Sequence, residues 1–360
     1  MGNNNYYGLI LAGGRGTRFW PQSRKRHAKQ VLAIGLDERT LIQQTVDRLR
    51  PLIPAERLWI LTNSFVRDEI IRQLPEIPAA QIIAEPAQRN TAPAIGLAAH
   101  ILSGIDPGAI FGVFPSDHVI GNPDHYLDLV KIAFQSAAEG NIAVLGVEAR
   151  WAETGYGYIE FPKDEPRTPA AVTRVIKFHE KPNKEKAQEY KDAGNYYWNA
   201  GMFFWKASVI ADALFRYRPS VAEPLAELPP FAAPNFMAEL ERVFPLCQDI
   251  SIDFAVLEHA TNVTGVPCDE FGWNDVGSWE AVYDLLPKDA NSNAGRSEVI
   301  TIKATGNYVD AGKKLVALIG VDNIIVVDTP DALLVVHRDK AQDVGQLVKD
   351  LETAGRENLL

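Results

Sequence analysis

The sequence predicts an α/β fold: a Rossmann-like, mostly parallel sheet with helices on both faces, plus a small β-rich C-terminal domain. Short apolar runs typical of buried strands alternate with helix-like segments through the first half of the chain. Such alternation indicates a sheet that helices cover on both sides. A polar stretch late in the chain then precedes a series of short β-rich runs. At 360 residues, the chain is long enough for one large domain and one small one.

The alternation can be followed element by element. The expected strands are short apolar runs at Leu9–Ala12, Leu58–Thr62, Gln81–Ala84, Ala109–Pro115 and Ile142–Val147. The segments between them have the length of helices and lie at Thr40–Leu49, Ser64–Leu74, Thr91–Leu102 and Tyr126–Glu139. Ligands of open α/β sheets bind beyond the carboxyl ends of the strands. The residues that follow these strands are therefore the first candidates for a functional site.

The pattern is less regular between Gly157 and Leu285, where aromatic-rich turns occur. Strand-like runs recur there at Val172–Phe178 and Gly201–Trp205. We therefore expect residues 1–287 to form one domain.

The remaining chain is expected to be a linker and a small domain. Residues 288–296 are polar and contain asparagine and glycine, as linkers do. Residues 297–360 contain four β-rich runs separated by turn residues, at Ser297–Thr301, Leu315–Ile319, Ile324–Asp328 and Leu333–His337. A final helix is expected near 341–351.

Composition excludes several function classes. The net charge of −10 argues against non-specific binding to nucleic acid. Cys247 and Cys268 lack C-x-x-C spacing and are expected to be free thiols in a reducing compartment. No apolar span reaches membrane length, and residues 1–7 lack the pattern of a signal peptide. We expect a cytoplasmic protein.

The glycine-rich loop after the first expected strand is the most informative motif. Three glycines, Gly13, Gly14 and Gly16, allow backbone N–H groups to approach an anion closely. Arg15, Arg18, Arg24 and Lys29 can supply positive charge, so the loop is suited to a polyphosphate. It lacks the third glycine of a dinucleotide loop and the lysine of a Walker loop. The structural alternative is a tight turn with surface arginines.

Two carboxylates in separate loops form a candidate metal site. Asp117 ends an expected strand in Phe114-Pro-Ser-Asp-His118, and Asp275 lies in the glycine-flanked Gly272-Trp-Asn-Asp-Val-Gly-Ser-Trp279. Together they could hold one Mg²⁺ with phosphate oxygens of a nucleotide. The alternative is that Asp117 caps a helix and Asp275 initiates a turn.

The segment Glu85-Pro-Ala-Gln-Arg-Asn90 follows the third expected strand. Glu85, Arg89 and Asn90 offer donors and acceptors suited to a purine edge. Asn90 or Thr91 could instead simply cap the following helix.

A second polar cluster comes from Tyr156-Gly-Tyr-Ile159, Phe178-His-Glu-Lys-Pro182 and Trp198-Asn-Ala-Gly-Met-Phe203. Glu180 and Asn199 suit sugar hydroxyls, and Lys181 suits a phosphate monoester. For Glu180 and Lys181 to converge, the strand must end near His179, and Pro182 should keep Lys181 extended. Asp253 is expected in the first turn of a helix that begins at Ser251, where its charge stabilises the helix dipole.

Taken together, these motifs resemble the sugar-nucleotide pyrophosphorylase family, and R-N-T-A-P points to its mannose-1-phosphate guanylyltransferase branch. The set includes L-A-G-G-R-G-T-R-F-W-P-Q-S-R, F-P-S-D-H, H-E-K-P, W-N-A-G-M-F, S-I-D-F-A-V-L-E and G-W-N-D-V-G-S-W, and it spans Leu9 to His337. One departure is visible, since Ala28 stands where the family usually has proline before Lys29.

The resemblance implies a nucleotidyltransferase catalytic domain over residues 1–287 that makes GDP-mannose and pyrophosphate from GTP and mannose 1-phosphate with Mg²⁺. It implies catalytic roles for Arg18, Lys29, Asp117 and Asp275, the two aspartates being the metal ligands. The implied nucleotide-binding residues are Leu11, Ala12, Gly13, Gly14, Gly16, Thr17, Glu85, Arg89, Asn90 and Ser116. The implied residues for the sugar phosphate are Gly157, Glu180, Lys181, Asn199 and Asp253.

The resemblance leaves alternatives open. The same chemistry with another base or sugar is one, as in a glucose-1-phosphate thymidylyl- or uridylyltransferase. A non-catalytic sugar-nucleotide sensor is another, although it should have lost Arg18, Lys29 or an aspartate. A homodimer is allowed, and neither nucleic acid nor a membrane is expected as a partner.

Overall fold

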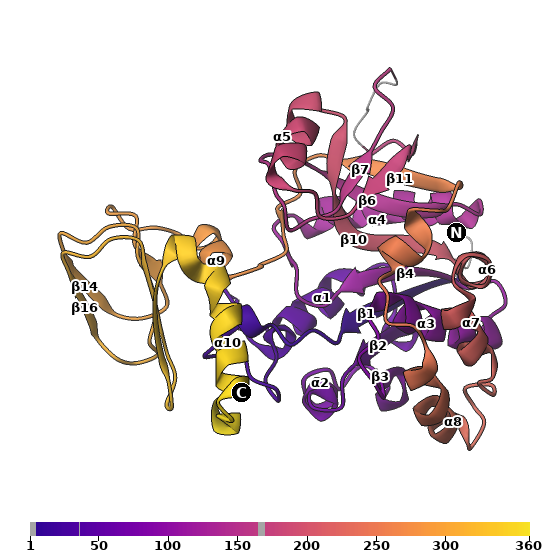
Figure 1. Ribbon diagram of the computed structural model, residues 1–360, viewed down its shortest axis with the longest axis horizontal. Coiled ribbons are helices and arrows are strands. Elements are labelled where there is room, and N and C mark those ends of the chain that lie inside the picture. Colours follow the sequence, from indigo (N-terminus) through magenta and orange to yellow (C-terminus); the bar gives the residue numbers. More distant parts are fainter. Residues whose placement is uncertain (1–4, 36, 165–169) are drawn as a thin grey trace.

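The computed structural model describes residues 5–35, 37–164 and 170–360. A ten-stranded mixed sheet forms the centre of the large domain (Figure 1). Its main path runs β3-β2-β1-β4-β10-β6-β11-β8, while β7 pairs with β10 and β9. The strands are β1 (Tyr6–Ala12), β2 (Leu58–Thr62), β3 (Ile82–Ala84), β4 (Ile110–Pro115), β6 (Ile142–Glu148), β7 (Tyr158–Glu160), β8 (Thr173–Arg174), β9 (Lys177–His179), β10 (Tyr196–Lys206) and β11 (Val263–Cys268).

The mostly parallel character of the sheet is confirmed. Strands β3, β2, β1 and β4 are mutually parallel, and β11 is parallel to β6. Strand β10 is antiparallel to both β4 and β6 and so joins the two parallel parts. The strand expected at Val172–Phe178 is divided into β8 and β9, which pair with different neighbours.

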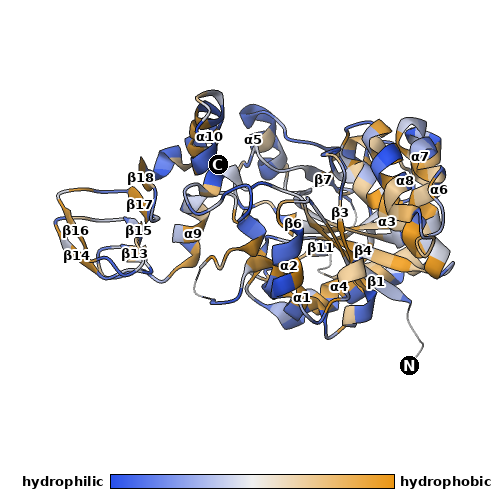
Figure 2. Ribbon diagram, turned by 90° about the horizontal axis from the view of Figure 1, so that it is seen from below, coloured by the Kyte–Doolittle hydropathy of each residue, from blue (hydrophilic) through white to orange (hydrophobic). Residues whose placement is uncertain are grey.

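Helices cover both faces of the sheet, because alternate strand residues are apolar on both sides. Leu9 of β1 packs into a core with α3 (Thr91–Ile105), α6 (Ala207–Tyr217), α7 (Pro219–Ala226) and α8 (Phe236–Val243). The next residue, Ile10, packs into the opposite core with α1 (Leu41–Leu49), α2 (Arg67–Gln73) and α4 (Pro123–Ala138). Helix α5 (Lys184–Ala193) lies beside β7. In Figure 2 the central strands are mostly hydrophobic, as two-sided burial requires.

The C-terminal domain contains parallel strands that stack as successive turns of a coil. Val299 pairs with Val316 and Tyr308 with Ile325, so these two turns each advance 17 residues, while the turn from Ala294 to Tyr308 advances 14. The parallel strands are β13 (Ala294–Gly295), β14 (Val299–Ile302), β15 (Tyr308–Asp310), β16 (Val316–Ile319) and β17 (Ile324–Asp328). A last strand, β18 (Leu333–His337), pairs antiparallel with β17. Strand β13 lies inside the segment expected to be a linker.

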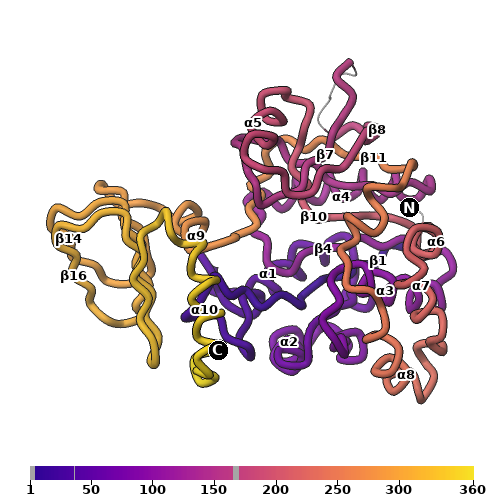
Figure 3. Tube along the Cα trace, in the orientation of Figure 1, coloured from indigo at the N-terminus to yellow at the C-terminus, as the bar shows by residue number. Residues whose placement is uncertain are grey.

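The C-terminal domain packs against the start of the chain. A 3₁₀ segment (Arg338–Asp343) leads into α10 (Val344–Thr353), which lies beside the N-terminal loop region in Figures 1 and 3. One hydrophobic core contains Phe19 and Trp20 of that region, Trp279 of α9 (Trp279–Leu285), and Ala341 and Val344. No helix in the described ranges combines the length and the apolar character needed to cross a membrane.

Candidate active site

The glycine-rich loop follows β1 and leads into a 3₁₀ turn (Thr17–Phe19). Gly16 has a φ of 62°, and a Cβ atom there would overlap the Cβ of Lys29, so this position requires glycine. A Cβ atom at Gly14 would meet nothing within 4 Å. The backbone at Gly14 therefore faces open space, while Gly16 packs against Lys29.

The start of the loop is tied to the sheet through backbone carbonyls. The carbonyl of Ala12 accepts from Gln30 Nε2 at 2.6 Å and from Thr62 Oγ1 at 2.9 Å. The carbonyl of Leu11 accepts from the amide of Ser116 at 3.2 Å. These bonds place the loop beside the carboxyl end of β4, where Asp117 follows.

Lys29 and the two aspartates predicted from the sequence come together. Lys29 Nζ donates to Asp117 Oδ2 at 2.9 Å and to the backbone carbonyl of Asp275 at 2.8 Å. The two aspartate loops are joined by a short ribbon in which β5 (Val119–Ile120) pairs with β12 (Trp273–Asn274). Residues far apart in the sequence therefore meet at the carboxyl end of the sheet, as expected.

The electrostatics of this centre keep Asp117 ionised. Burial by itself would raise the pKa of Asp117, but the Lys29 ammonium and other donors outweigh it, and the pKa is lowered. Burial lowers the pKa of the neighbouring His118 to about 4, so its imidazole is neutral at pH 7. Its Nδ1 accepts from Trp273 Nε1 at 3.2 Å. Sequence reasoning did not assign a role to His118.

Tyr156 is a further residue that sequence reasoning left unassigned. Its hydroxyl donates to Asp275 Oδ1 at 2.7 Å, and its ring packs edge-on against Trp198 and Trp273. Its position directly before Gly157 was the available signal. Tyr156 therefore links the Asp275 loop to the second polar cluster.

A cavity of about 310 Å³ lies on one side of the loop. It is lined by Gly13, Arg15, Lys25, Thr62, Asn63, Ser64, Phe65, Glu85, Pro86, Ala87 and Gln88. Burial raises the pKa of Glu85 to about 8, and within the described part of the chain its carboxylate takes part in no hydrogen bond or ion pair. Phe65 is 60% exposed and had no sequence signal beyond following β2. Glu85 thus offers an unpaired acceptor group to this cavity.

Arg89 and Asn90, predicted to bind the purine together with Glu85, do not lie beside it in the cavity. The Arg89 guanidinium donates twice to the carbonyl of Pro245, at 3.1 and 2.7 Å. The Asn90 side chain accepts from the amide of Thr91 at the start of α3, with a φ of 65°. Neither residue lines the 310 Å³ cavity, and both hold the segment that carries Glu85.

The second polar cluster also assembles. The side-chain Nδ2 of Asn199 donates to Asp253 Oδ1 at 2.9 Å, and the backbone N–H of Asn199 donates to the carbonyl of Gly157 at 2.8 Å. A Cβ atom at Gly157 would lie 2.6 Å from Glu180 Oε2, so the glycine makes room for that carboxylate. Burial, reinforced by the charge of Glu180, raises the pKa of Asp253 to about 6. Asp253 begins a π-helical turn (Asp253–Leu257) rather than lying in the first turn of an α-helix.

Lys181 differs from the prediction in its backbone. Strand β9 ends at His179, as expected, but Lys181 has a φ of 43° and is not extended. The following proline disfavours the right-handed helical region, and the chain turns through the left-handed region instead. This turn lets Lys181 Nζ lie 2.8 Å from Glu180 Oε1 while remaining 64% exposed.

Four cations in or after the loop contact the C-terminal domain. Arg15 pairs with Glu352 and Lys25 with Glu357, at 2.5 and 2.6 Å. Arg24 pairs with Asp331 at 3.0 Å. Arg18 donates to Gln342 Oε1 at 2.7 Å. A second cavity, of about 480 Å³, lies at this boundary, and Arg18, Tyr156, Asp275 and Gln342 are among its lining residues.

Comparisons with known proteins agree with this architecture. Residues 7–292 match the nucleotidyl transferase family model, and residues 297–351 match the MannoseP isomerase/GMP-like beta-helix domain. The alginate biosynthesis protein AlgA of Pseudomonas aeruginosa is 36% identical over 97% of this chain and 72% of its own length. A mannose-1-phosphate guanylyltransferase of Escherichia coli is 37% identical over 96% of this chain and 73% of its own length. A crystal structure described as a mannose-1-phosphate geranyltransferase from Thermus thermophilus has a TM-score of 0.86 at 32% identity, covering 97% of this chain and 99% of the other.

Proposed function

The chain belongs to the nucleotidyl transferase family, and we propose that it makes GDP-mannose and pyrophosphate from GTP and α-D-mannose 1-phosphate. The observation that carries this proposal is that three parts of the chain meet at one edge of the sheet: the glycine-rich loop, the two loops that carry Asp117 and Asp275, and the polar cluster around Gly157. The glycine-rich loop reaches Asp117 through Lys29, and Asp275 reaches the Gly157 cluster through Tyr156. The name of the Escherichia coli relative supports the same pair of substrates.

The family generally requires a divalent metal, and Asp117 and Asp275 are the residues that fit Mg²⁺. In the described ranges no group of three or more His, Cys, Asp or Glu side chains could hold a metal ion by itself. Mg²⁺ typically takes one or two carboxylates and completes its coordination with phosphate oxygens and water. Two aspartates beside the glycine-rich loop, which is suited to binding phosphate, match that donor set. When bound there, the ion would neutralise charge on the reacting phosphates.

The residues suit an in-line transfer without a general base. A phosphate oxygen of mannose 1-phosphate, already anionic at pH 7, would form a bond to the α-phosphorus of GTP. The bond from that phosphorus to the bridging oxygen would break, and that oxygen would leave with pyrophosphate. No proton must move, so the protein's contribution is positioning and charge stabilisation. Arg18 and Lys29 would stabilise the leaving pyrophosphate, and Lys181 would bind the sugar phosphate.

Guanine selectivity is assigned to Glu85. Guanine presents two neighbouring donors, N1–H and the exocyclic amine, and an ionised carboxylate offers two acceptors. Glu85 lines the 310 Å³ cavity beside the loop, and no hydrogen bond from another described residue occupies its carboxylate. Uracil and thymine present only a single ring N–H on the corresponding edge. The carboxylate therefore favours GTP over UTP and dTTP.

The decisive experiment measures pyrophosphate release from each of the four nucleoside triphosphates, crossed with mannose and glucose 1-phosphates. GTP with mannose 1-phosphate should give the highest kcat/KM. A higher value for UTP or dTTP with glucose 1-phosphate would replace this assignment by a thymidylyl- or uridylyltransferase. Pyrophosphate release from none of the eight pairs would indicate a sugar-nucleotide sensor.

A further inference from the structure

Arg18, at the end of the glycine-rich loop, is held by Gln342, which lies 324 positions later in the chain. Its Nη1 donates to Gln342 Oε1 at 2.7 Å. The aliphatic part of Arg18 faces the first turn of α10, where a Cβ atom at Gly345 would lie 3.5 Å from Arg18 Cγ. Within the described residues, no other protein acceptor bonds to this guanidinium. One nitrogen is thus fixed by the C-terminal domain, and the other donors remain available.

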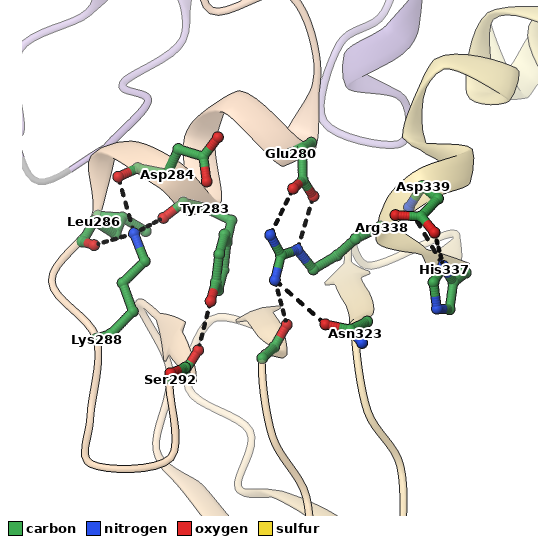
Figure 4. Close-up of polar contacts among 11 residues, drawn as sticks. Glu280, Tyr283, Asp284, Leu286, Lys288, Ser292, Asn323, His337, Arg338 and Asp339 are labelled. Atoms are coloured by element: carbon green, nitrogen blue, oxygen red, sulfur yellow. Dashed lines mark hydrogen bonds and ion pairs between the residues drawn. The ribbon is translucent and has the colours of Figure 1, made fainter.

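The Gln342 side chain is exposed, but the segment that carries it is held in place. Its neighbours Ala341 and Val344 are 1% and 3% exposed in the core that the C-terminal domain shares with the N-terminal loop region. At the start of the same 3₁₀ segment, Arg338 donates to both carboxylate oxygens of Glu280, at 2.8 and 2.6 Å (Figure 4). The Arg338 guanidinium also stacks 3.6 Å from the ring centroid of Tyr283. The segment that carries Gln342 is therefore anchored to α9.

Helix α9 also connects the Asp275 loop with the N-terminal segment that carries Arg18 and Trp20. Helix α9 begins four residues after Asp275, and Trp279 Nε1 donates to the carbonyl of Trp20 at 3.1 Å. Trp20 Nε1 in turn donates to the carbonyl of Leu359 at 2.9 Å. The Arg18–Gln342 contact lies on the wall of the 480 Å³ cavity that also exposes Asp275 and Tyr156. The contact is thus part of the cleft and not a remote surface feature.

We propose that Gln342 is a positioning residue for the transfer reaction, so that the C-terminal domain completes the active site. Its amide oxygen holds Arg18 in an orientation that leaves the remaining donors for the leaving pyrophosphate. A neutral acceptor orients the guanidinium without cancelling its charge, which a carboxylate at this position would partly do. The oriented guanidinium stabilises the transition state, in which negative charge develops on the leaving pyrophosphate, because a donor that is already in position needs no reorganisation at that moment. This inference rests on the proposed function.

The first test compares Gln342→Met, which keeps length but removes the acceptor, with Gln346→Met as the matched control. Gln346 lies on α10, and among the described residues its side chain donates to Asp350 of the same helix alone. Gln342→Met should lower kcat about three- to tenfold, the range of one hydrogen bond, and change the KM for GTP by less than about twofold. Gln346→Met should match the parent enzyme. Equal kcat values for Gln342→Met and the parent would overturn the proposal.

A double-mutant cycle separates positioning from a general effect on folding. In an Arg18→Ala background, Gln342→Met should cause no further loss of kcat, because it acts through Arg18. If the two losses multiply, Gln342 acts elsewhere and the proposal is wrong. A failure of the proposed function has a different signature, since the parent would then show no turnover of GTP with mannose 1-phosphate.

Discussion

Lys29 and Asp117 form an ion pair in which the lysine side chain is 5% exposed, the aspartate side chain is 35% exposed, and Lys29 Nζ lies 2.9 Å from Asp117 Oδ2. The same Nζ donates to the carbonyl of Asp275, so one ammonium group joins both loops that carry the proposed metal ligands. Gly16 permits this arrangement, since it leaves space for the stem of Lys29. Lys29 therefore contacts both the glycine-rich loop and the two loops that carry the carboxylates.

The carboxylates should be essential for turnover and dispensable for folding. Asp117→Asn and Asp275→Asn each remove an anionic oxygen ligand, and each should lower kcat by about two orders of magnitude or more. Both variants keep a hydrogen-bond acceptor for Lys29 or Tyr156, so their far-UV circular dichroism should match the parent. Rates measured against Mg²⁺ concentration provide the check. A variant with parental activity and parental Mg²⁺ dependence would return its aspartate to a capping or turn role.

Two glycines of the phosphate loop should respond in opposite ways. Gly14→Val should fold normally, because its Cβ position is open, but should weaken GTP binding about tenfold or more by blocking approach to the backbone. Gly16→Ala should instead destabilise the protein by about 1–3 kcal/mol through its positive φ and its overlap with Lys29. Calorimetric titration with GTP and thermal melts distinguish the two. Unchanged GTP affinity in Gly14→Val would remove the loop from the site.

GTP binding should depend on pH through Glu85. Burial raises the pKa of Glu85 to about 8, and guanine requires the ionised form. Affinity for GTP should therefore rise as pH increases from 6 to about 8, by up to about tenfold per pH unit, and then level off. Glu85→Gln should weaken GTP binding about tenfold or more and remove the dependence that the carboxylate causes. Parallel slopes for parent and variant would contradict the role of Glu85.

The same residue gives a stability prediction with a defined sign. Its pKa in the folded protein lies above the ordinary value of 4.5, so ionisation costs stability as pH rises from about 4.5 towards 8. Without nucleotide, Glu85→Gln should therefore unfold at a higher temperature than the parent at pH 8, and at the same temperature at pH 4. Thermal melts at the two pH values test this. A lower midpoint for Glu85→Gln at pH 8 would show that the carboxylate has a stabilising partner.

Lys181 should act on the sugar phosphate and not on the nucleotide. Its ammonium is exposed and contacts only Glu180 among the described residues. Lys181→Ala should raise the KM for mannose 1-phosphate about tenfold and leave the KM for GTP nearly unchanged, because the charge meets the monoester phosphate. Lys184→Ala, at the exposed start of α5, is the control with the same loss of charge. An effect of Lys181→Ala on GTP alone would place the lysine in the nucleotide half of the site.

The parts of the site that could be read from the sequence are those that local pattern determines. The run from Leu9 to Ala12 is uniformly apolar, so its strand and the loop after it were predictable, as was the position of Asp117 after β4. Which distant residue each polar side chain bonds to could not be predicted in the same way. Arg89 has the chemistry of a ligand-binding residue, yet its donors are taken by the carbonyl of Pro245, 156 residues later. Likewise, nothing near Gln342 in the sequence indicates that it meets Arg18.

The long-range contacts of the phosphate loop also set an order for assembly. Arg15, Arg18 and Trp20 contact partners that lie 337, 324 and 339 positions later in the chain. During synthesis from the N-terminus, β1 can pair with β2 and β4 long before those partners exist. The sheet can therefore fold first, while the loop acquires its final geometry only once α10 and the residues after it have been made. A nascent chain would accordingly possess the scaffold of the enzyme well before it could fix the positions of Arg15, Arg18 and Trp20.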